Sequence, residues 1–154
     1  MRYVTHSPME TRSLGEELSR LLRPGDILAL CGDMGAGKSE LARGIARGLG
    51  VEGPVASPTF TILNVYDSGR IPLYHFDWYR IADPEELVEI GAEDYLPGGG
   101  VALVEWPERA QEMLPEAYLK VSIKKGPEEN DRLIEITPVG CNADTGNGKD
   151  TWQA

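Results

Sequence analysis

The sequence predicts a three-layer α/β fold, in which a mostly parallel central sheet has helices on both faces and an antiparallel hairpin at its edge. Two observations indicate this class. Apolar runs of strand length alternate with segments of helical period, and two alternating segments near the C-terminus are joined by a polar linker. The chain has 154 residues, of which 41% are hydrophobic and 26% charged, which is typical of one domain with a sizeable core.

The first 50 residues predict a helix, a strand and a second helix. Residues 7–10, Ser-Pro-Met-Glu, combine a capping serine, a proline at the first helical position and a glutamate three residues after the cap. A Pro-Gly pair at residues 24–25 ends the leucine pattern that follows. Residues 26–31 form a near-continuous apolar run, as expected of a central strand covered on both faces. Residues 37–49 then have helical periodicity, with Gly50 at the end.

Further strands are expected along the rest of the chain. Residues 60–66 and 71–77 are joined by a turn-like tetrapeptide, so we expect them to pair as a hairpin. Residues 83–86 begin a capped helix, and residues 101–105 form a second buried strand.

The C-terminal part predicts the edge hairpin and a tail. Residues 118–124 and 132–137 alternate apolar and polar side chains, which favours an antiparallel edge hairpin. Residues 1–138 are therefore expected to form the domain. Residues 139–154 are rich in Gly, Asn, Asp and Thr with few apolar anchors, and we expect a disordered tail.

A phosphate loop is the strongest functional signal. Residues 32–39, Gly-Asp-Met-Gly-Ala-Gly-Lys-Ser, match the pattern GxxxxGK[ST] directly between the predicted central strand and the second helix. The glycines let successive N–H groups converge on one anion, and the helix N-terminus adds partial positive charge. Lys38 is expected to bridge the β- and γ-phosphates and the Ser39 hydroxyl to bind magnesium. The sequence therefore predicts a nucleotide site in a P-loop NTPase-type fold.

Two acids end predicted strands. Asp77 ends the strand 71–77, and Glu105 ends the strand 101–105 in the position of a Walker B acid. In an open α/β sheet the ligand lies outside the carboxyl ends of the strands, so both acids and the phosphate loop should face one crevice. For either acid the alternative is an ordinary carboxylate at a strand end.

The chain is acidic, with 25 acidic against 15 basic residues, and the excess lies almost wholly in residues 78–154. Such a surface disfavours direct binding of nucleic acid; it is either a solvated face or a docking face for a basic protein. No apolar run approaches the ~20 residues that cross a bilayer, and no signal peptide or disulfide framework is evident. We therefore expect a cytoplasmic protein without membrane association.

Four segments, in their order and spacing, closely resemble the TsaE (formerly YjeE) family of bacterial P-loop ATPases over about residues 1–137. They are the phosphate loop, Ser-Pro-Thr-Phe-Thr at 57–61, Tyr-His-Phe-Asp-Trp-Tyr-Arg at 74–80 and Glu-Trp-Pro at 105–107. The resemblance implies an ATPase that uses ATP and Mg²⁺ in making tRNA threonylcarbamoyladenosine (t6A). It also implies a complex with the proteins TsaB and TsaD, whose turnover the ATPase supports, and contact with tRNA only through that complex.

The same resemblance implies roles for individual residues. Lys38 resembles the phosphate-binding lysine, and Ser39 and Glu105 resemble the magnesium ligands. Asp77 resembles the acid that polarises the attacking water, and Thr59 a switch-loop residue that senses the γ-phosphate, with a plain turn hydroxyl as the alternative. The expected catalytic residues are Lys38, Asp77 and Glu105, and the expected nucleotide-binding residues are Gly32, Asp33, Met34, Gly35, Ala36, Gly37, Lys38, Ser39, Glu40 and Thr59. Glu40 departs from the family, which commonly has a second hydroxyl residue there, so its backbone N–H is expected to serve the α-phosphate instead.

Four neighbouring side chains have two interpretations each. Arg80 is an arginine finger or, as we favour, an ion-pair partner of the acidic segment 85–94. His75 is expected to be packed or hydrogen-bonded, because a single further histidine cannot complete a zinc set. Trp78 and Trp106 are expected to cover the core, with stacking on a partner or a base as the alternative.

Three other functions fit a phosphate loop. A small-molecule kinase needs several arginines around the transferred phosphate, but between residues 78 and 116 the chain has only Arg80 and Arg109. A guanine-nucleotide switch needs an Asn-Lys-x-Asp reader or an Asp-x-x-Gly switch, and neither occurs. A nucleotide-dependent interaction module with negligible hydrolysis differs from an ATPase only in rate and stays open.

Overall fold

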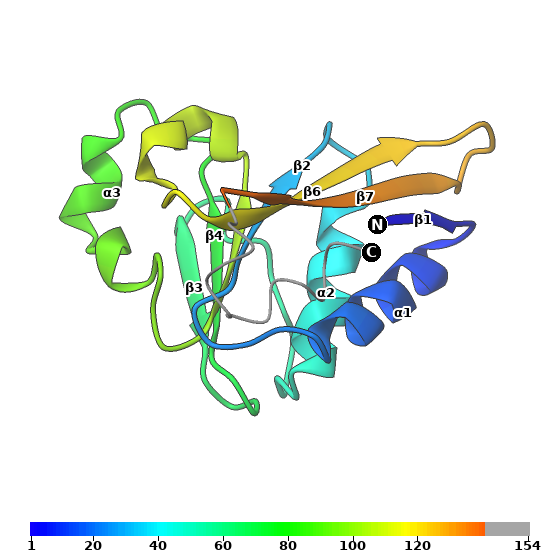
Figure 1. Cartoon of the computed structure of the whole chain (residues 1–154), viewed down its shortest axis with the longest axis horizontal. Helices are drawn as coiled ribbons and strands as arrows, with labels where there is room; N and C mark the ends of the chain where they lie inside the picture. Colours follow the sequence, from blue (N-terminus) through cyan, green and yellow to red (C-terminus); the bar gives the residue numbers. More distant parts are fainter. Residues whose placement is uncertain (141–154) are drawn as a thin grey trace.

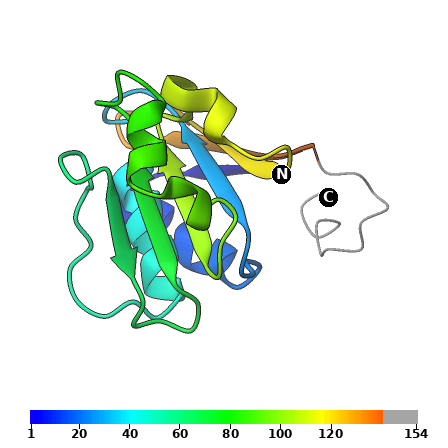
Figure 2. The same cartoon turned by 90° about the vertical axis from the view of Figure 1, so that its left-hand side faces the viewer.

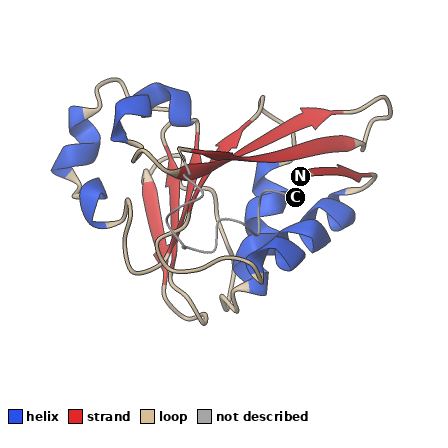
Figure 3. Cartoon of the chain, in the orientation of Figure 1, coloured by secondary structure: helices blue, strands red, loops and turns tan. Residues whose placement is uncertain are grey.

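Seven strands form one sheet in the order β1-β7-β6-β2-β5-β4-β3 (Figures 1 and 3). The computed structural model describes residues 1–140. Its elements are β1 (Arg2–Thr5), α1 (Pro8–Ser19), β2 (Ile27–Cys31), α2 (Lys38–Gly48), β3 (Leu63–Tyr66), β4 (Leu73–Asp77), α3 (Glu85–Glu89), η1 (Ala92–Asp94), β5 (Val101–Glu105), η2 (Pro107–Met113), β6 (Tyr118–Lys125) and β7 (Arg132–Val139).

The centre of the sheet is parallel, and its outer pairs are antiparallel. Strand β2 pairs in parallel with β5 on one side and β6 on the other, and β5 pairs in parallel with β4. The pairs β1–β7, β6–β7 and β3–β4 are antiparallel. The predicted fold class is confirmed, and the carboxyl ends of β2, β4 and β5 lie at one edge of the sheet.

The core is divided between the two faces of the sheet, because successive residues of a strand point to opposite sides. Leu28 and Leu30 of β2 pack with the leucines of α1 and α2, whereas Ile27 packs with residues of α3, η1 and η2. Figure 2 shows α1 and α2 on one side of the sheet and the α3–η1 segment on the other. The predicted three layers are thus present.

Helices α1 and α2 lie in direct backbone contact. A Cβ atom at Gly44 of α2 would stand 2.0 Å from the Arg12 carbonyl oxygen, and one at Gly15 of α1 would stand 2.6 Å from that of Leu41. The start of α1 is capped as predicted, since the Ser7 hydroxyl accepts the Glu10 N–H at 3.1 Å. The glycine contacts hold the two helices together, and the serine cap stabilises the first turn of α1.

Three expectations about element boundaries need correction. The antiparallel hairpin β6–β7 is present but is not the edge of the sheet, because β1 pairs with β7 outside it. Strand β3 begins at Leu63 rather than at residue 60, because Ile62 has a φ of +68° that no strand accommodates. Strand β7 extends to Val139, which pairs with Tyr118, and the predicted tail beyond residue 140 lies outside the described residues.

Within residues 1–140, no helix is both long and apolar enough to cross a bilayer.

An ion pair between His6 and Asp131 joins the β1–α1 connection to the β6–β7 turn. The His6 Nδ1 and Asp131 Oδ1 atoms are 2.8 Å apart. The hydrogen bond and charge of Asp131 raise the pKa of His6 above 6.5, and the hydrogen bond from His6 lowers the pKa of Asp131 below 3.8. The ion pair therefore contributes its full stabilisation between about pH 3.8 and pH 6.5, the ordinary pKa values of the two groups. This contribution is lost as the pH rises through the raised pKa of His6 or falls through the lowered pKa of Asp131.

We expect His6→Gln to lower the free energy of unfolding more at about pH 5.5 than at about pH 8.5. Urea denaturation of both proteins at the two pH values measures this difference. Arg2→Gln is the matched control, because it removes an exposed ion pair with Glu135 whose members do not titrate in that range. An equal loss for His6→Gln at both pH values would contradict a stabilising ion pair.

Candidate functional site

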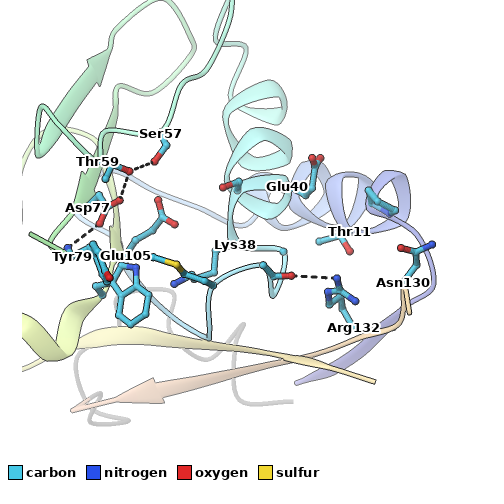
Figure 4. A pocket seen from close by; sticks show the side chains of 16 residues that line it. Thr11, Lys38, Glu40, Ser57, Thr59, Asp77, Tyr79, Glu105, Asn130 and Arg132 are labelled. Atoms are coloured by element: carbon cyan, nitrogen blue, oxygen red, sulfur yellow. Dashed lines mark hydrogen bonds between the residues drawn. The ribbon is translucent and has the colours of Figure 1, made fainter. Parts of the chain in front are cut away.

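A cavity of about 370 Å³ opens at the carboxyl ends of β2, β4 and β5 (Figure 4). The parallel register places Asp77 opposite Glu105, and Glu105 opposite Leu30 of β2. All the predicted site residues line the cavity except Gly32, Asp33 and Ala36, which lie in the same loop. The convergence that parallel strand ends predict is therefore present.

The loop between β2 and α2 takes a shape that depends on its glycines. Gly35 has a φ of +76° and Gly37 a φ of +106°, backbone values that residues with a Cβ atom rarely adopt. A Cβ atom at Gly32 would stand 2.7 Å from the Ile123 carbonyl oxygen of β6. The loop therefore folds tightly over the end of the sheet and leads directly into α2.

Lys38 stands at the start of α2 with its charge unpaired. The side chain is 6% exposed, and within residues 1–140 its Nζ atom is buried without a hydrogen-bond partner. Its Nζ lies 4.0 Å from the centre of the Trp106 ring, a cation–π contact. Within residues 1–140 no side chain caps α2, so the first N–H groups of the helix lack a side-chain acceptor there. Buried cations and helix N-termini of this kind are typical of anion sites.

The Asp77 carboxylate is held by two hydrogen-bond donors. Its Oδ2 accepts from the Thr59 hydroxyl at 3.0 Å, and its Oδ1 accepts from the Tyr79 backbone N–H at 2.9 Å. Because the Thr59 hydrogen points to Asp77, the Ser57 hydroxyl donates to Thr59, 2.8 Å away. The 57–61 segment thus reaches the strand-end acid through Thr59, as Figure 4 shows.

The second acid, Glu105, is paired with a buried histidine. Its Oε2 lies 2.8 Å from His75 Nε2. The prediction that His75 is hydrogen-bonded is confirmed, and no cluster of three or more His, Cys, Asp or Glu side chains able to hold a metal is found in the described part of the chain.

Glu40 turns its side chain away from a ligand role. Its Oε2 accepts from Arg12 of α1 at 2.8 Å, and its Oε1 accepts from Arg43 at 2.8 Å. The side chain therefore joins the two helices, which leaves only the Glu40 backbone N–H for a bound anion.

The far end of the cavity was not predicted from the sequence. It is lined by Pro8 and Thr11 of α1, Asn130 of the β6–β7 connection and Arg132 of β7, and the labelled residues of this group lie opposite Asp77 and Glu105 in Figure 4. The Arg132 Nη2 atom donates to the Gly35 carbonyl oxygen at 3.3 Å. These residues come from segments far apart in the sequence, and no motif marks them.

Aromatic side chains near the acids divide into core and cavity. Trp78 is fully buried and Trp106 packs partly buried against the same core cluster, as predicted for both. Trp106 also lines the cavity and packs on Tyr79 with ring centres 5.0 Å apart. The favoured interpretation of Arg80 was wrong: its guanidinium lies 4.5 Å from the centre of the exposed Phe60 ring, and no ion pair joins it to residues 85–94. The adjacency of Trp106 and Ser57 to predicted site residues was the signal that could have found them.

A family model described as "Threonylcarbamoyl adenosine biosynthesis protein TsaE" matches residues 5–134. The chain belongs to the TsaE family. It is 41% identical to the tRNA threonylcarbamoyladenosine biosynthesis protein TsaE of Bacillus subtilis over 140 residues, which is 91% of this chain and 87% of the relative. It is 42% identical to the protein of the same name from Nostoc, over 85% of this chain and 82% of the relative.

A solved structure agrees with this membership. The crystal structure of Bacillus subtilis YdiB superposes with a TM-score of 0.78 at 36% identity, covering 92% of this chain and 86% of the other. The fold of this TsaE-family chain is accordingly the P-loop type that the sequence predicted.

The residues present fit a nucleoside triphosphate with its divalent cation. The unpaired Lys38 ammonium and the uncapped start of α2 suit phosphate oxygens. The hydroxyl of Ser39 and the carboxylates of Asp77 and Glu105 border the same cavity, and oxygen ligands of this kind suit Mg²⁺.

Proposed function

We propose that this chain binds ATP and hydrolyses it with Mg²⁺ in support of t6A biosynthesis. The observation that carries the proposal is the buried Lys38 ammonium, which has no hydrogen-bond partner among the residues that the structure describes. It stands at the start of α2, in one cavity with Asp77 and Glu105. The names of the relatives, which are tRNA threonylcarbamoyladenosine biosynthesis proteins, support the biological role.

The loop between β2 and α2 and the Lys38 side chain would bind the phosphates. The Lys38 ammonium would bind the β- and γ-phosphates, and the N–H groups of residues 33–40 would bind the remaining phosphate oxygens. At the far end of the cavity, Thr11 and Asn130 offer polar groups to the nucleoside.

Ser39 and Glu105 would hold the magnesium ion. When bound, the ion neutralises negative charge on the phosphate oxygens. The Asp77 and Glu105 carboxylates stand on paired strands, opposite each other in the register, and such neighbouring strands are about 4.8 Å apart. Neighbouring carboxylates repel each other, which favours a cation beside them.

Asp77 would position the water that attacks the γ-phosphorus. As the new P–O bond forms, the bond from the γ-phosphorus to the bridging oxygen breaks and the water releases a proton, giving ADP, inorganic phosphate and H⁺. Because Thr59 and Tyr79 both donate to Asp77, the carboxylate is held in one orientation to accept a hydrogen bond from that water.

Calorimetry with ATP and a phosphate-release assay, each with and without purified TsaB and TsaD, test this function. We expect ATP binding to the chain alone, slow phosphate release, and faster release with both partners. Binding without release in any mixture would indicate a nucleotide-dependent interaction module. Absence of ATP binding would overturn the proposal.

The proposed partners are TsaB and TsaD, with tRNA reached only through their complex. Acidic residues gather on the layer of α3, η1 and η2, where Glu89, Glu93, Asp94, Glu108 and Glu112 are exposed. Such a surface favours a basic patch on the partner and disfavours tRNA itself.

We expect the affinity for the TsaB and TsaD pair to fall about 10-fold between low and high salt, because salt screens charges on exposed surfaces. Glu89→Lys should weaken the association at low salt, whereas Glu52→Lys, the same charge change at an exposed position after α2, should not. Surface plasmon resonance at several salt concentrations measures both effects. An affinity that is independent of salt would exclude docking by charge.

A further inference from the structure

Glu105 is anchored by a histidine from the neighbouring strand. His75 of β4 and Glu105 of β5 are 3% and 7% exposed at their side chains, and the 2.8 Å contact joins Nε2 to Oε2. His75 lies two positions before Asp77, so both side chains point to the same face of β4. The histidine thus lies in the protein interior, behind the pair of acids that border the cavity.

The hydrogen of this contact belongs to the histidine. A carboxylate only accepts hydrogen bonds, so Nε2 carries the hydrogen and donates to Oε2. The other ring nitrogen, Nδ1, is buried and has no partner within residues 1–140. No hydrogen bond to Oε1 of Glu105 is found in that range either, so one oxygen of the carboxylate is fixed and the other is available.

Packing alone does not favour a histidine here. On the same face of β4, the preceding inward residue is Leu73, and the residue opposite His75 in the register is Leu103; both are fully buried. A leucine at position 75 would continue this apolar row, whereas a buried polar atom without a partner costs stability. The histidine therefore provides something that an apolar core residue cannot, which is its hydrogen bond to Glu105.

We propose that His75 is a positioning residue for the magnesium ligand Glu105, an inference that rests on the proposed function. Its Nε2–H group holds Oε2 and so prevents the carboxylate from rotating about its terminal torsion, which keeps Oε1 available for the ion. Partners of this kind orient the ligands of a metal, and their loss typically weakens metal binding or activity by 10- to 100-fold.

Three variants separate this role from packing. His75→Leu removes the donor and fills the space. His75→Gln keeps an N–H donor at the same number of bonds from Cβ as Nε2. Leu73→Met is the matched control, since it changes a fully buried neighbour on the same face without a hydrogen bond to Glu105.

The readout is Mn²⁺ binding to the ATP complex, measured by electron paramagnetic resonance, together with ATP affinity in EDTA and the melting temperature. For His75→Leu we expect a loss of Mn²⁺ affinity of about 10- to 100-fold, with the melting temperature and the metal-free ATP affinity retained. His75→Gln should recover most of the Mn²⁺ affinity, and Leu73→Met should match the parent chain.

Two results would overturn the inference while the proposed function stands: parental Mn²⁺ affinity in His75→Leu, or a folded His75→Gln that binds Mn²⁺ as weakly as His75→Leu. A parent chain that binds neither ATP nor Mn²⁺ with ATP would overturn the proposed function and this inference together.

Discussion

Replacing Lys38 with alanine is expected to abolish detectable ATP binding, with a loss of affinity of at least about 100-fold. The Nζ atom is buried and has no hydrogen-bond partner in the described part of the chain, so its charge is available for phosphate oxygens. Hydrogen bonds to charged groups contribute about 1.5–3 kcal/mol each, and about 1.4 kcal/mol corresponds to tenfold in affinity. Isothermal titration with ATP measures the loss.

The same variant should change little in stability, because within residues 1–140 the Lys38 ammonium makes no hydrogen bond and the substitution removes its cation–π contact with Trp106 together with an unpaired buried charge. Lys124→Ala, an equal loss of charge at an exposed position of β6, is the control and should bind ATP like the parent. Parental affinity in Lys38→Ala would remove the lysine from the site.

Replacing Asp77 with asparagine is expected to leave ATP affinity within a few-fold and to lower the rate of hydrolysis by about 10²–10⁴-fold. Asparagine retains an oxygen that can accept the Tyr79 N–H, but it lacks the charge that orients the attacking water. Phosphate release under saturating ATP and Mg²⁺, with calorimetry on the same preparation, measures both quantities.

Asp67→Asn removes an equal charge from the exposed β3–β4 turn and should hydrolyse ATP at the parental rate. An Asp77→Asn chain that also hydrolyses at that rate would show that the acid has no part in the reaction. A chain that no longer binds ATP would assign Asp77 to binding instead.

The order of elements at the centre of the fold was predictable because their signals are local. The apolar run of β2 and the buried run of β5 are covered on both faces, and their residues alone indicate this. Strand β1 was missed because four residues with Val4 exposed show no pattern, and its partner β7 lies about 130 positions later in the chain. Its position at the edge depends on tertiary pairing.

The site residues at the ends of the parallel strands were predicted correctly from the sequence. The residues that α1 and β7 contribute to the cavity were not predicted. Asp77 and Glu105 meet because β4 and β5 run in parallel and in register, which follows from their places at the ends of apolar runs. Thr11 and Arg132 reach the cavity only because α1 packs on α2 and β7 folds back beside the loop. Such long-range packing has no local signature.

The direct contact of α1 and α2 has a mechanical consequence. Glycine backbone lies at the helix crossing, and the Arg12–Glu40 ion pair spans it, so the two helices form one closely packed unit. We expect a displacement at Lys38 to be transmitted to Pro8 and Thr11 of α1 through these contacts. The N-terminal margin of the molecule is thereby connected to events at the glycine loop, some 30 positions further along the chain.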